Sequence, residues 1–194
     1  MALRNKSMPT PSSEAVEVEL KRERYKQKYR AILKSTVYTL IVVAAIAVLI
    51  ATLVLPVLQI SGESMEPTLS NGEIVVLVKT KSFERGDLCA FYYSNKILIK
   101  RVIGLPGDII VIDAEGTVFV NNVPIDEPYV SDRALGECDL EFPYEVPEEQ
   151  LFVLGDKRAT SIDSRSTVIG CIERDNILGR ILFRVWPFGK ISNF

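Results

Sequence analysis

The pattern of apolar and polar positions divides the chain into three parts. Residues 37–58, VYTLIVVAAIAVLIATLVLPVL, contain no charged side chain. At a rise of about 1.5 Å per residue, a helix of roughly 22 residues covers about 33 Å, the thickness of one bilayer core. We therefore predict a membrane-spanning helix over residues 35–58, between a basic segment (1–34) and a domain with a different pattern (59–194).

Two alternatives for the apolar run are a buried core helix and a cleaved signal peptide. A core helix of this length would rarely lack polar interruptions in so small a protein. A signal peptide has an apolar stretch of about 7–15 residues close to the N-terminus, whereas residues 1–36 precede this run. An uncleaved anchor is favoured, with Pro56 near its end, where a helix can stop at little cost.

The segment before the apolar run is strongly basic. Residues 21–34, KRERYKQKYRAILK, contain seven Lys or Arg and one Glu. Because basic flanks remain cytoplasmic, we expect the N-terminus inside the cell, contact of this segment with membrane lipid, and residues 59–194 outside. RNA binding is an alternative for the basic run. Residues 1–20 are expected to form a loose tail.

After residue 59 the pattern becomes that of a β structure. EGT (115–117) predicts a hairpin, RGD (85–87) a turn, and the acidic stretch at 134–149 an exposed loop with a short edge strand. We therefore predict a mostly β fold, an N-terminal transmembrane helix followed by a coiled antiparallel sheet or barrel-like domain. The β-branched runs that predict strands are EIVVLVKT, DLCAFYY, KILIKRVIG, DIIVIDAEGTVFVNN, QLFVLGD and NILGRILFRVWP.

Composition restricts the chemistry that this domain can perform. The chain has no histidine, which excludes Ser-His-Asp and Cys-His catalysis and every zinc site that contains histidine. The three cysteines, Cys89, Cys138 and Cys171, are too few for a four-thiolate metal site and are expected to be small buried side chains. A Cys138–Cys171 disulfide is an alternative. We expect neither a metal nor a cofactor.

The charges are unevenly distributed along the chain. Residues 1–34 carry nine Lys or Arg against four Asp or Glu, whereas residues 61–194 carry fourteen against twenty-one. A basic head and an acidic body separated by an uncharged run are expected to occupy different compartments. The acidic body also argues against nucleic acid as a partner.

Ser64, in SGESMEPT (61–68), is a candidate nucleophile that needs a base. Without histidine, the base is a carboxylate, an N-terminal amine or a lysine. The N-terminal amine is expected across the membrane, and ionised Glu63 and Glu66 are weak bases. Lys100 lies in KILIK, where burial among apolar neighbours would lower its pKa from about 10.4 by the roughly three units that catalysis near neutrality requires. The alternative for a lysine in a strand is a solvent-facing amine, so the pattern makes Lys100 a candidate only.

Three segments occur in the order and spacing of three motifs of the type I signal peptidases: SGESMEPTL (61–69), IKRVIGLPGD (99–108) and LGDKRATSIDSR (154–165). VNNVPIDEPYV and VPEEQLFVLGD are also similar to this family. The chain thus resembles a family of membrane-anchored serine proteases that use a Ser-Lys dyad. The resemblance covers the apolar run and nearly all of the following domain, and leaves out the tail and the acidic loop.

This resemblance implies roles for individual residues. It implies that Ser64 is the nucleophile and Lys100 the general base. It also implies that Ser161 orients the lysine by a hydrogen bond, and that Gly155 allows a close approach of the backbone there.

The resemblance further implies supporting ion pairs and apolar walls. Asp163 with Arg165 matches a structural pair of the family, and Asp156 with Arg101 is similar to a second pair. The residues that match walls of the shallow substrate subsites are Met65, Ile60, Leu69 and Ile99.

The sequence departs from the common family pattern at three places. Gly62 stands where Gram-negative members have a serine that completes the oxyanion hole, so the hole is expected to use the Ser64 N–H and another donor. Glu63 and Glu66 are uncommon beside the nucleophile, and would raise the pKa of Lys100 if they lay close to it. The third motif commonly reads GDNRDNS and here reads GDKRATS; the differing residues are Lys157, Ala159 and Thr160.

By resemblance, we expect a single-pass cell-membrane endopeptidase that removes signal peptides from secreted preproteins, with its N-terminus cytoplasmic. The preprotein is expected to bind as an added strand, with small residues at the first and third positions before the cut. One alternative is an inactive accessory protein for assembly of pilins or surface proteins. A self-cleaving repressor protease is another, which the anchor and the acidic body disfavour.

Overall fold

The computed structural model describes residues 12–187, and the chain divides into two units after Ala51. The first unit contains helix α1 (Ser13–Val54). Within it, Val16–Ile50 includes a window with a mean hydropathy of 2.2 and no buried side chain. By length and composition alone, this helix is able to cross a membrane.

Both ends of the helix differ from the prediction. Residues 13–20 are helical rather than a loose tail, because Glu, Ala and Leu favour helices and a Glu17–Lys21 pair supports the first turns. The part of the predicted tail at 1–11 lies outside the described residues. At the other end the helix stops at Val54 and not at residue 58, since Pro56 cannot continue it.

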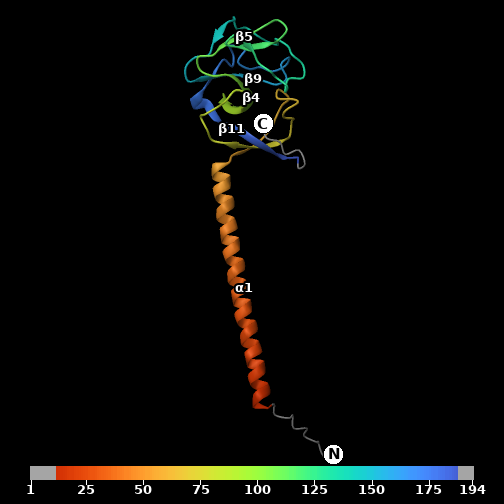
Figure 1. Cartoon of the computed structure of the whole chain (residues 1–194), viewed down its shortest axis with the longest axis vertical. Helices are drawn as coiled ribbons and strands as arrows, with labels where there is room; N and C mark the ends of the chain where they lie inside the picture. Colours follow the sequence, from red (N-terminus) through yellow and green to blue (C-terminus); the bar gives the residue numbers. More distant parts are fainter. Residues whose placement is uncertain (1–11, 188–194) are drawn as a thin grey trace, which may run out of the picture. The chain divides into compact units, whose positions relative to one another are not determined.

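The second unit contains two antiparallel sheets. Strand order is β1-β2-β11-β3-β4-β9-β10 in the seven-stranded sheet and β7-β6-β5-β8 in the four-stranded sheet, and Figure 1 shows β5 at one end of this unit and β11 at the other. The bounds are β1 (Val57–Gln59), β2 (Ile74–Val78), β3 (Leu88–Tyr93), β4 (Lys96–Gly104), β5 (Ile109–Ile112), β6 (Val118–Val120), β7 (Val123–Pro124), β8 (Tyr144–Glu145), β9 (Gln150–Leu154), β10 (Ile172–Glu173) and β11 (Ile177–Trp186), with a 3-10 turn at Arg174–Asn176.

The predicted β architecture is confirmed. Each predicted run contains a strand, the EGT hairpin joins β5 to β6, the RGD segment is a turn before β3, and β8 is the short edge strand of the acidic loop. The short strands β1, β7 and β10 were not predicted. Val57 and Leu58 were assigned to the membrane helix, but they pair with β2 in the sheet.

Three apolar clusters form the core of the second unit. The cluster next to the site packs one end of the seven-stranded sheet against the segment that follows β1; its buried members are Ile60, Met65, Leu69, Val75, Leu77, Leu88, Ala90 and Ile181. A second cluster fills the space between the two sheets around Ile110 and Phe152. The sheets are therefore joined by packing, which fixes the strands that carry the site.

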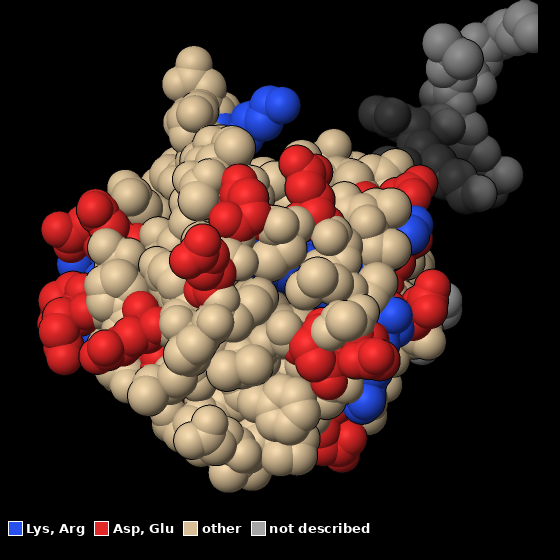
Figure 2. Space-filling model, turned by 90° about the horizontal axis from the view of Figure 1, so that it is seen from above, with Lys and Arg blue, Asp and Glu red and all other residues tan. Residues whose placement is uncertain are grey.

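Charge on the face seen in Figure 2 is mainly negative, with Asp and Glu side chains in several groups and few Lys or Arg among them. This distribution follows the acidic balance of residues 61–194. A surface of this kind repels polyanions.

Candidate active site

Lys100 is the fifth residue of β4 and pairs with Cys89 of β3 in the middle of the seven-stranded sheet. Its side chain is buried, with 3% of the residue exposed. Burial lowers the pKa of Lys100 to about 8, Asp163 and Asp156 raise it, and Arg165 lowers it. An amine with this pKa is partly uncharged at neutral pH, as a general base must be.

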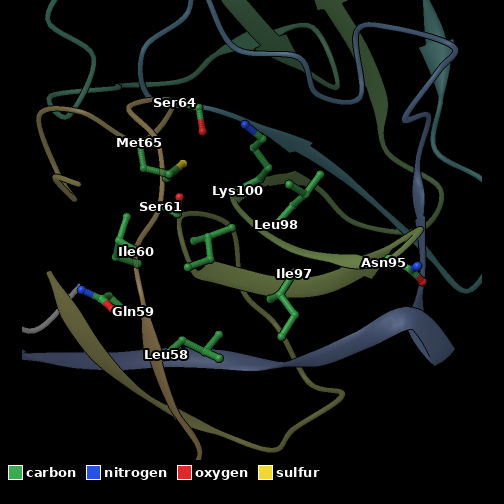
Figure 3. A pocket seen from close by; sticks show the side chains of 12 residues that line it. Leu58, Gln59, Ile60, Ser61, Ser64, Met65, Asn95, Ile97, Leu98 and Lys100 are labelled. Atoms are coloured by element: carbon green, nitrogen blue, oxygen red, sulfur yellow. The ribbon is translucent and has the colours of Figure 1, made fainter. Parts of the chain in front are cut away.

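Ser64 lies in a turn closed by the Glu66 N–H, which donates to the Glu63 carbonyl oxygen at 3.0 Å. Its backbone carbonyl accepts a 3.1 Å hydrogen bond from the Lys157 N–H. Figure 3 shows the Ser64 hydroxyl and the Lys100 amine facing each other at one end of a cavity that both residues line. A residue of the first family motif and one of the second thus meet at the same place.

Ser161 is the hydrogen-bond partner of this lysine. The Lys100 amine donates to the Ser161 hydroxyl oxygen at 2.9 Å, and 1% of Ser161 is exposed. Gly155 lies directly against the serine, since a Cβ at that position would be 2.1 Å from the Ser161 hydroxyl oxygen and 2.7 Å from the Ser64 carbonyl oxygen. Only glycine fits between these two segments.

The Asp163–Arg165 pair is present and wholly buried. Arg165 Nε donates to one Asp163 carboxylate oxygen and Nη2 to the other, each at 2.8 Å, and both side chains are 0% exposed. The second Asp163 oxygen also accepts the Gly155 N–H at 2.9 Å. Arg165 further donates to the Ser161 carbonyl oxygen at 3.2 Å. This pair therefore fixes the backbone on both sides of the lysine's partner.

The second predicted pair, Arg101 with Asp156, is present as a bidentate contact of 2.9 and 2.6 Å. The guanidinium also lies 3.9 Å from the ring centroid of Tyr129. Thr68, four residues after Ser64, donates its hydroxyl proton to the same Asp156 carboxylate. The pair thus connects β4, the third motif and the nucleophile segment in one network.

The cavity at the site has a volume of about 310 Å³. Of the four residues that the resemblance assigns to subsite walls, Ile60, Met65 and Ile99 line this cavity, whereas Leu69 does not. Leu69 is 0% exposed and packs behind the lining residues in the core cluster, so its predicted place in the wall is corrected. The full lining is Leu58, Gln59, Ile60, Ser61, Gly62, Ser64, Met65, Asn95, Ile97, Leu98, Ile99 and Lys100.

Two ion-pair groups near the site were not found from the sequence. Arg158 and Glu127 form a buried pair, and Arg158 also donates to the Gly155 carbonyl oxygen at 3.1 Å. Lys157 Nζ lies 2.9 Å from a carboxylate oxygen of both Glu63 and Glu66. For the second group the sequence did contain a signal: two negative charges flank the nucleophile, and the third motif carries a positive charge at Lys157 in place of the usual asparagine.

Glu63 and Glu66, which were expected to raise the pKa of Lys100 if they lay close to it, pair with Lys157 instead. Their carboxylates bind Lys157, which lowers the pKa of Glu63 through a hydrogen bond and charge. The carboxylates that act on Lys100 are Asp163 and Asp156.

Within the described part of the chain, no three His, Cys, Asp or Glu side chains are grouped to hold a metal ion.

All three cysteines are free, so the alternative of a Cys138–Cys171 disulfide is wrong. Cys89 is buried as expected, and Cys138 and Cys171 are half-buried.

Comparison with known proteins gives the family. The model of the family described as "Signal peptidase, peptidase S26" matches residues 33–186. A signal peptidase I of Bacillus licheniformis is 34% identical over 168 residues, covering 80% of this chain and 89% of the relative. A signal peptidase IB of Staphylococcus aureus (strain N315) is 36% identical over 154 residues, covering 69% and 79%.

Among solved structures, a signal peptidase I from Enterococcus faecalis V583 has 29% sequence identity and a TM-score of 0.43, covering 53% of this chain and 98% of that chain. The family match and the sequence relatives define the class, a serine peptidase. The chain belongs to the signal peptidase family, peptidase S26, and within it to the type I enzymes.

Proposed function

We propose that this chain is a membrane-anchored endopeptidase that removes signal peptides from secreted preproteins with Ser64 as nucleophile and Lys100 as general base. The observation that carries the proposal is the buried Lys100 amine, 3% exposed, which shares one end of the cavity with the Ser64 hydroxyl. A buried lysine that has no hydrogen bond to a carboxylate of residues 12–187 is costly to fold, and a need for an uncharged amine accounts for it.

In the proposed reaction, uncharged Lys100 removes the hydroxyl proton of Ser64 while the serine oxygen attacks the scissile carbonyl carbon. The C–N bond then breaks, and the Lys100 ammonium gives its proton to the leaving amine. Water, deprotonated by the same amine, hydrolyses the resulting ester and releases Ser64. The Ser161 hydroxyl holds the amine in place throughout, through the 2.9 Å hydrogen bond.

The cavity supports the proposed preference for small residues at the first and third positions before the cut. Its walls include apolar side chains of β4 (Ile97, Leu98 and Ile99) and of the segment that begins at β1, an edge strand of its sheet. An extended peptide between these walls would add to the sheet by main-chain hydrogen bonds, and its alternate side chains would enter the cavity. At about 310 Å³ the cavity lies at the lower end of the range for ligand pockets, and its apolar lining suits apolar side chains.

Helix α1 supports the proposed membrane attachment. Its apolar side chains are exposed along its length, for example Ile41 at 57% and Val48 at 62%, and basic residues at 21–34 precede the uncharged run. We infer a single span with a cytoplasmic N-terminus, lipid contact at the basic segment and the β domain outside. Attachment would confine the enzyme and tethered preproteins to one surface and raise their effective concentration.

The proposal is tested by comparing wild type with Ser64→Ala and Lys100→Ala on a preprotein that carries an Ala-x-Ala site. Lys96→Ala is a matched control, because Lys96 is an exposed lysine of the same strand. We expect both dyad variants to lose cleavage by at least about 1,000-fold and the control to retain it. Equal cleavage by all four proteins would refute the dyad, and no cleavage by wild type would favour the accessory role.

A further inference from the structure

Lys157 is bound on both sides of the candidate nucleophile. Its side-chain nitrogen lies 2.9 Å from Oε2 of Glu63 and 2.9 Å from Oε2 of Glu66. These glutamates are the first residue before Ser64 and the second residue after it. We call this group of two ion pairs, formed by Lys157 with Glu63 and with Glu66, the Lys157 bridge.

The backbone of Lys157 connects the same turn to the partner of Lys100. Its N–H donates to the Ser64 carbonyl oxygen at 3.1 Å, and its carbonyl oxygen accepts the Ser161 N–H at 3.1 Å. The Ser161 hydroxyl oxygen in turn accepts the hydrogen bond from the Lys100 amine. A single residue therefore contacts the segment that carries the nucleophile and the segment that orients the base.

We propose that Lys157 is a positioning residue, whose side chain holds the Ser64 turn in register with Ser161 and so sets the place of the nucleophile relative to Lys100. This role rests on the proposed function. In the described chain, the turn is tied to the third motif by the Lys157 N–H at the Ser64 carbonyl oxygen and, at its far end, by the Thr68 hydroxyl at Asp156. The two contacts of the bridge, one on each side of Ser64, add side-chain restraints next to the nucleophile itself.

The exposure of the turn explains why this additional attachment matters. Residues 61–63 and Pro67 are exposed, and within 61–68 only Met65 is fully buried. Packing thus fixes the turn mainly through one side chain. Exposed ion pairs contribute little to the stability of a fold, whereas a displacement of about 1 Å at a reacting group can lower a rate by up to about 100-fold.

A different route from Lys157 to catalysis would be a direct effect of charge on the pKa of Lys100. The groups that face Lys100 and act on its pKa are Asp163, Asp156 and Arg165. If the bridge acted through space, removal of Lys157 would raise that pKa and removal of the glutamates would lower it. Positioning predicts instead that both changes lower kcat and that neither moves the pH profile.

The test compares Lys157→Met, Lys157→Arg, the double variant Glu63→Ala with Glu66→Ala, and the triple variant that combines Lys157→Met with both alanines. We expect kcat to fall about tenfold in Lys157→Met and in the double variant, with KM little changed. The triple variant should be no worse than either, because all three break one bridge. Lys157→Arg should retain most of the activity.

Lys81→Met is the matched control, since it breaks an exposed ion pair of similar length, 2.6 Å, with Asp175 and away from the site. It should leave kcat unchanged. Thermal unfolding, measured for each variant, should shift by no more than a few degrees in any of them.

Three outcomes would overturn the positioning role. The first is a wild-type kcat in Lys157→Met, and the second is a pH profile that shifts in opposite directions in Lys157→Met and in the double glutamate variant. The third is a triple variant whose loss of kcat is the product of the losses in the other two. Should Lys157→Met unfold, the double variant and Lys157→Arg still decide, because both keep a cationic side chain at position 157. These failures concern the bridge alone as long as Ser64→Ala abolishes cleavage. Cleavage that survives Ser64→Ala would instead refute the proposed function.

Discussion

The Lys100 amine donates a 2.9 Å hydrogen bond to the hydroxyl of Ser161, a residue 61 positions further along the chain. Among the hydrogen bonds and ion pairs of residues 12–187, this contact is the only one that holds the end of the lysine side chain. Because an amine in an apolar site has few polar partners, its direction depends strongly on this one oxygen.

Ser161→Ala should lower kcat by about tenfold or more with little change in KM, because the amine loses its orienting acceptor but the cavity keeps its walls. Steady-state cleavage of a preprotein measures both parameters. Ser164→Ala is the control, since its buried hydroxyl binds the Val153 N–H at 2.9 Å and has no contact with the lysine. If the two variants lose kcat equally, the loss reflects general destabilisation and not orientation of Lys100.

Gly155→Ala should disrupt the site from the other side. The new Cβ would lie 2.1 Å from the Ser161 hydroxyl oxygen and 2.7 Å from the Ser64 carbonyl oxygen, so one of these segments must move. We expect loss of cleavage and a decrease of about 2 kcal/mol in the free energy of unfolding. Urea denaturation and a cleavage assay measure the two effects. Wild-type values in both would show that the two segments are less close than this geometry requires.

Cleavage should depend on pH through the protonation state of Lys100. With its pKa lowered to about 8 by burial, the amine is mostly protonated below that value and cannot accept the Ser64 proton. We expect kcat/KM to be half-maximal near pH 8 and, two pH units lower, about 100-fold below its maximum. An acidic optimum would contradict Lys100 as the base.

The same shift in pKa predicts how Lys100→Met changes stability. Between the folded pKa of about 8 and the reference value of 10.5, the unfolded wild type binds more protons than the folded protein, so its stability rises with pH. Below pH 8 the full cost of burying the charge remains, on the order of 3 kcal/mol.

Lys100→Met should therefore be more stable than wild type at pH 7, and its advantage should shrink between pH 8 and 10.5. Chemical denaturation over this pH range measures the difference. Lys96→Met, a change at an exposed position of the same strand, is the matched control for replacing a lysine by methionine. A constant gap for Lys100→Met would mean that the lysine titrates alike in the folded and unfolded chain.

The sequence predicted the β domain well because a run of β-branched residues between turn signals is a local property. β4 (Lys96–Gly104) matches the predicted run KILIKRVIG, and Lys100 is the first of five consecutive buried residues in it. The end of the helix was predicted wrongly for a physical reason. Val57 and Leu58 are apolar, and the same composition suits a membrane helix and a strand, so Pro56 and the pairing with β2 are what separate the two.

The site was less accessible to sequence reasoning because its contacts join distant positions. From the pattern alone Lys100 was a candidate, and its partner Ser161 was inferred only from the family resemblance. The wall that the family resemblance implied for Leu69 was wrong, since the resemblance does not reveal that this side chain packs in the core. The Lys157 bridge spans 91 and 94 positions, a separation that no local pattern encodes.

The most direct test of the account is the pKa of Lys100 itself, measured by NMR titration of the full-length protein labelled with 13C at the lysine ε-carbons. The Lys100 signal is assigned by its absence from the spectrum of Lys100→Met. Burial of the amine predicts a Lys100 signal that titrates near pH 8. A Lys100 signal that titrates near the reference value of 10.5 would contradict its role as the base.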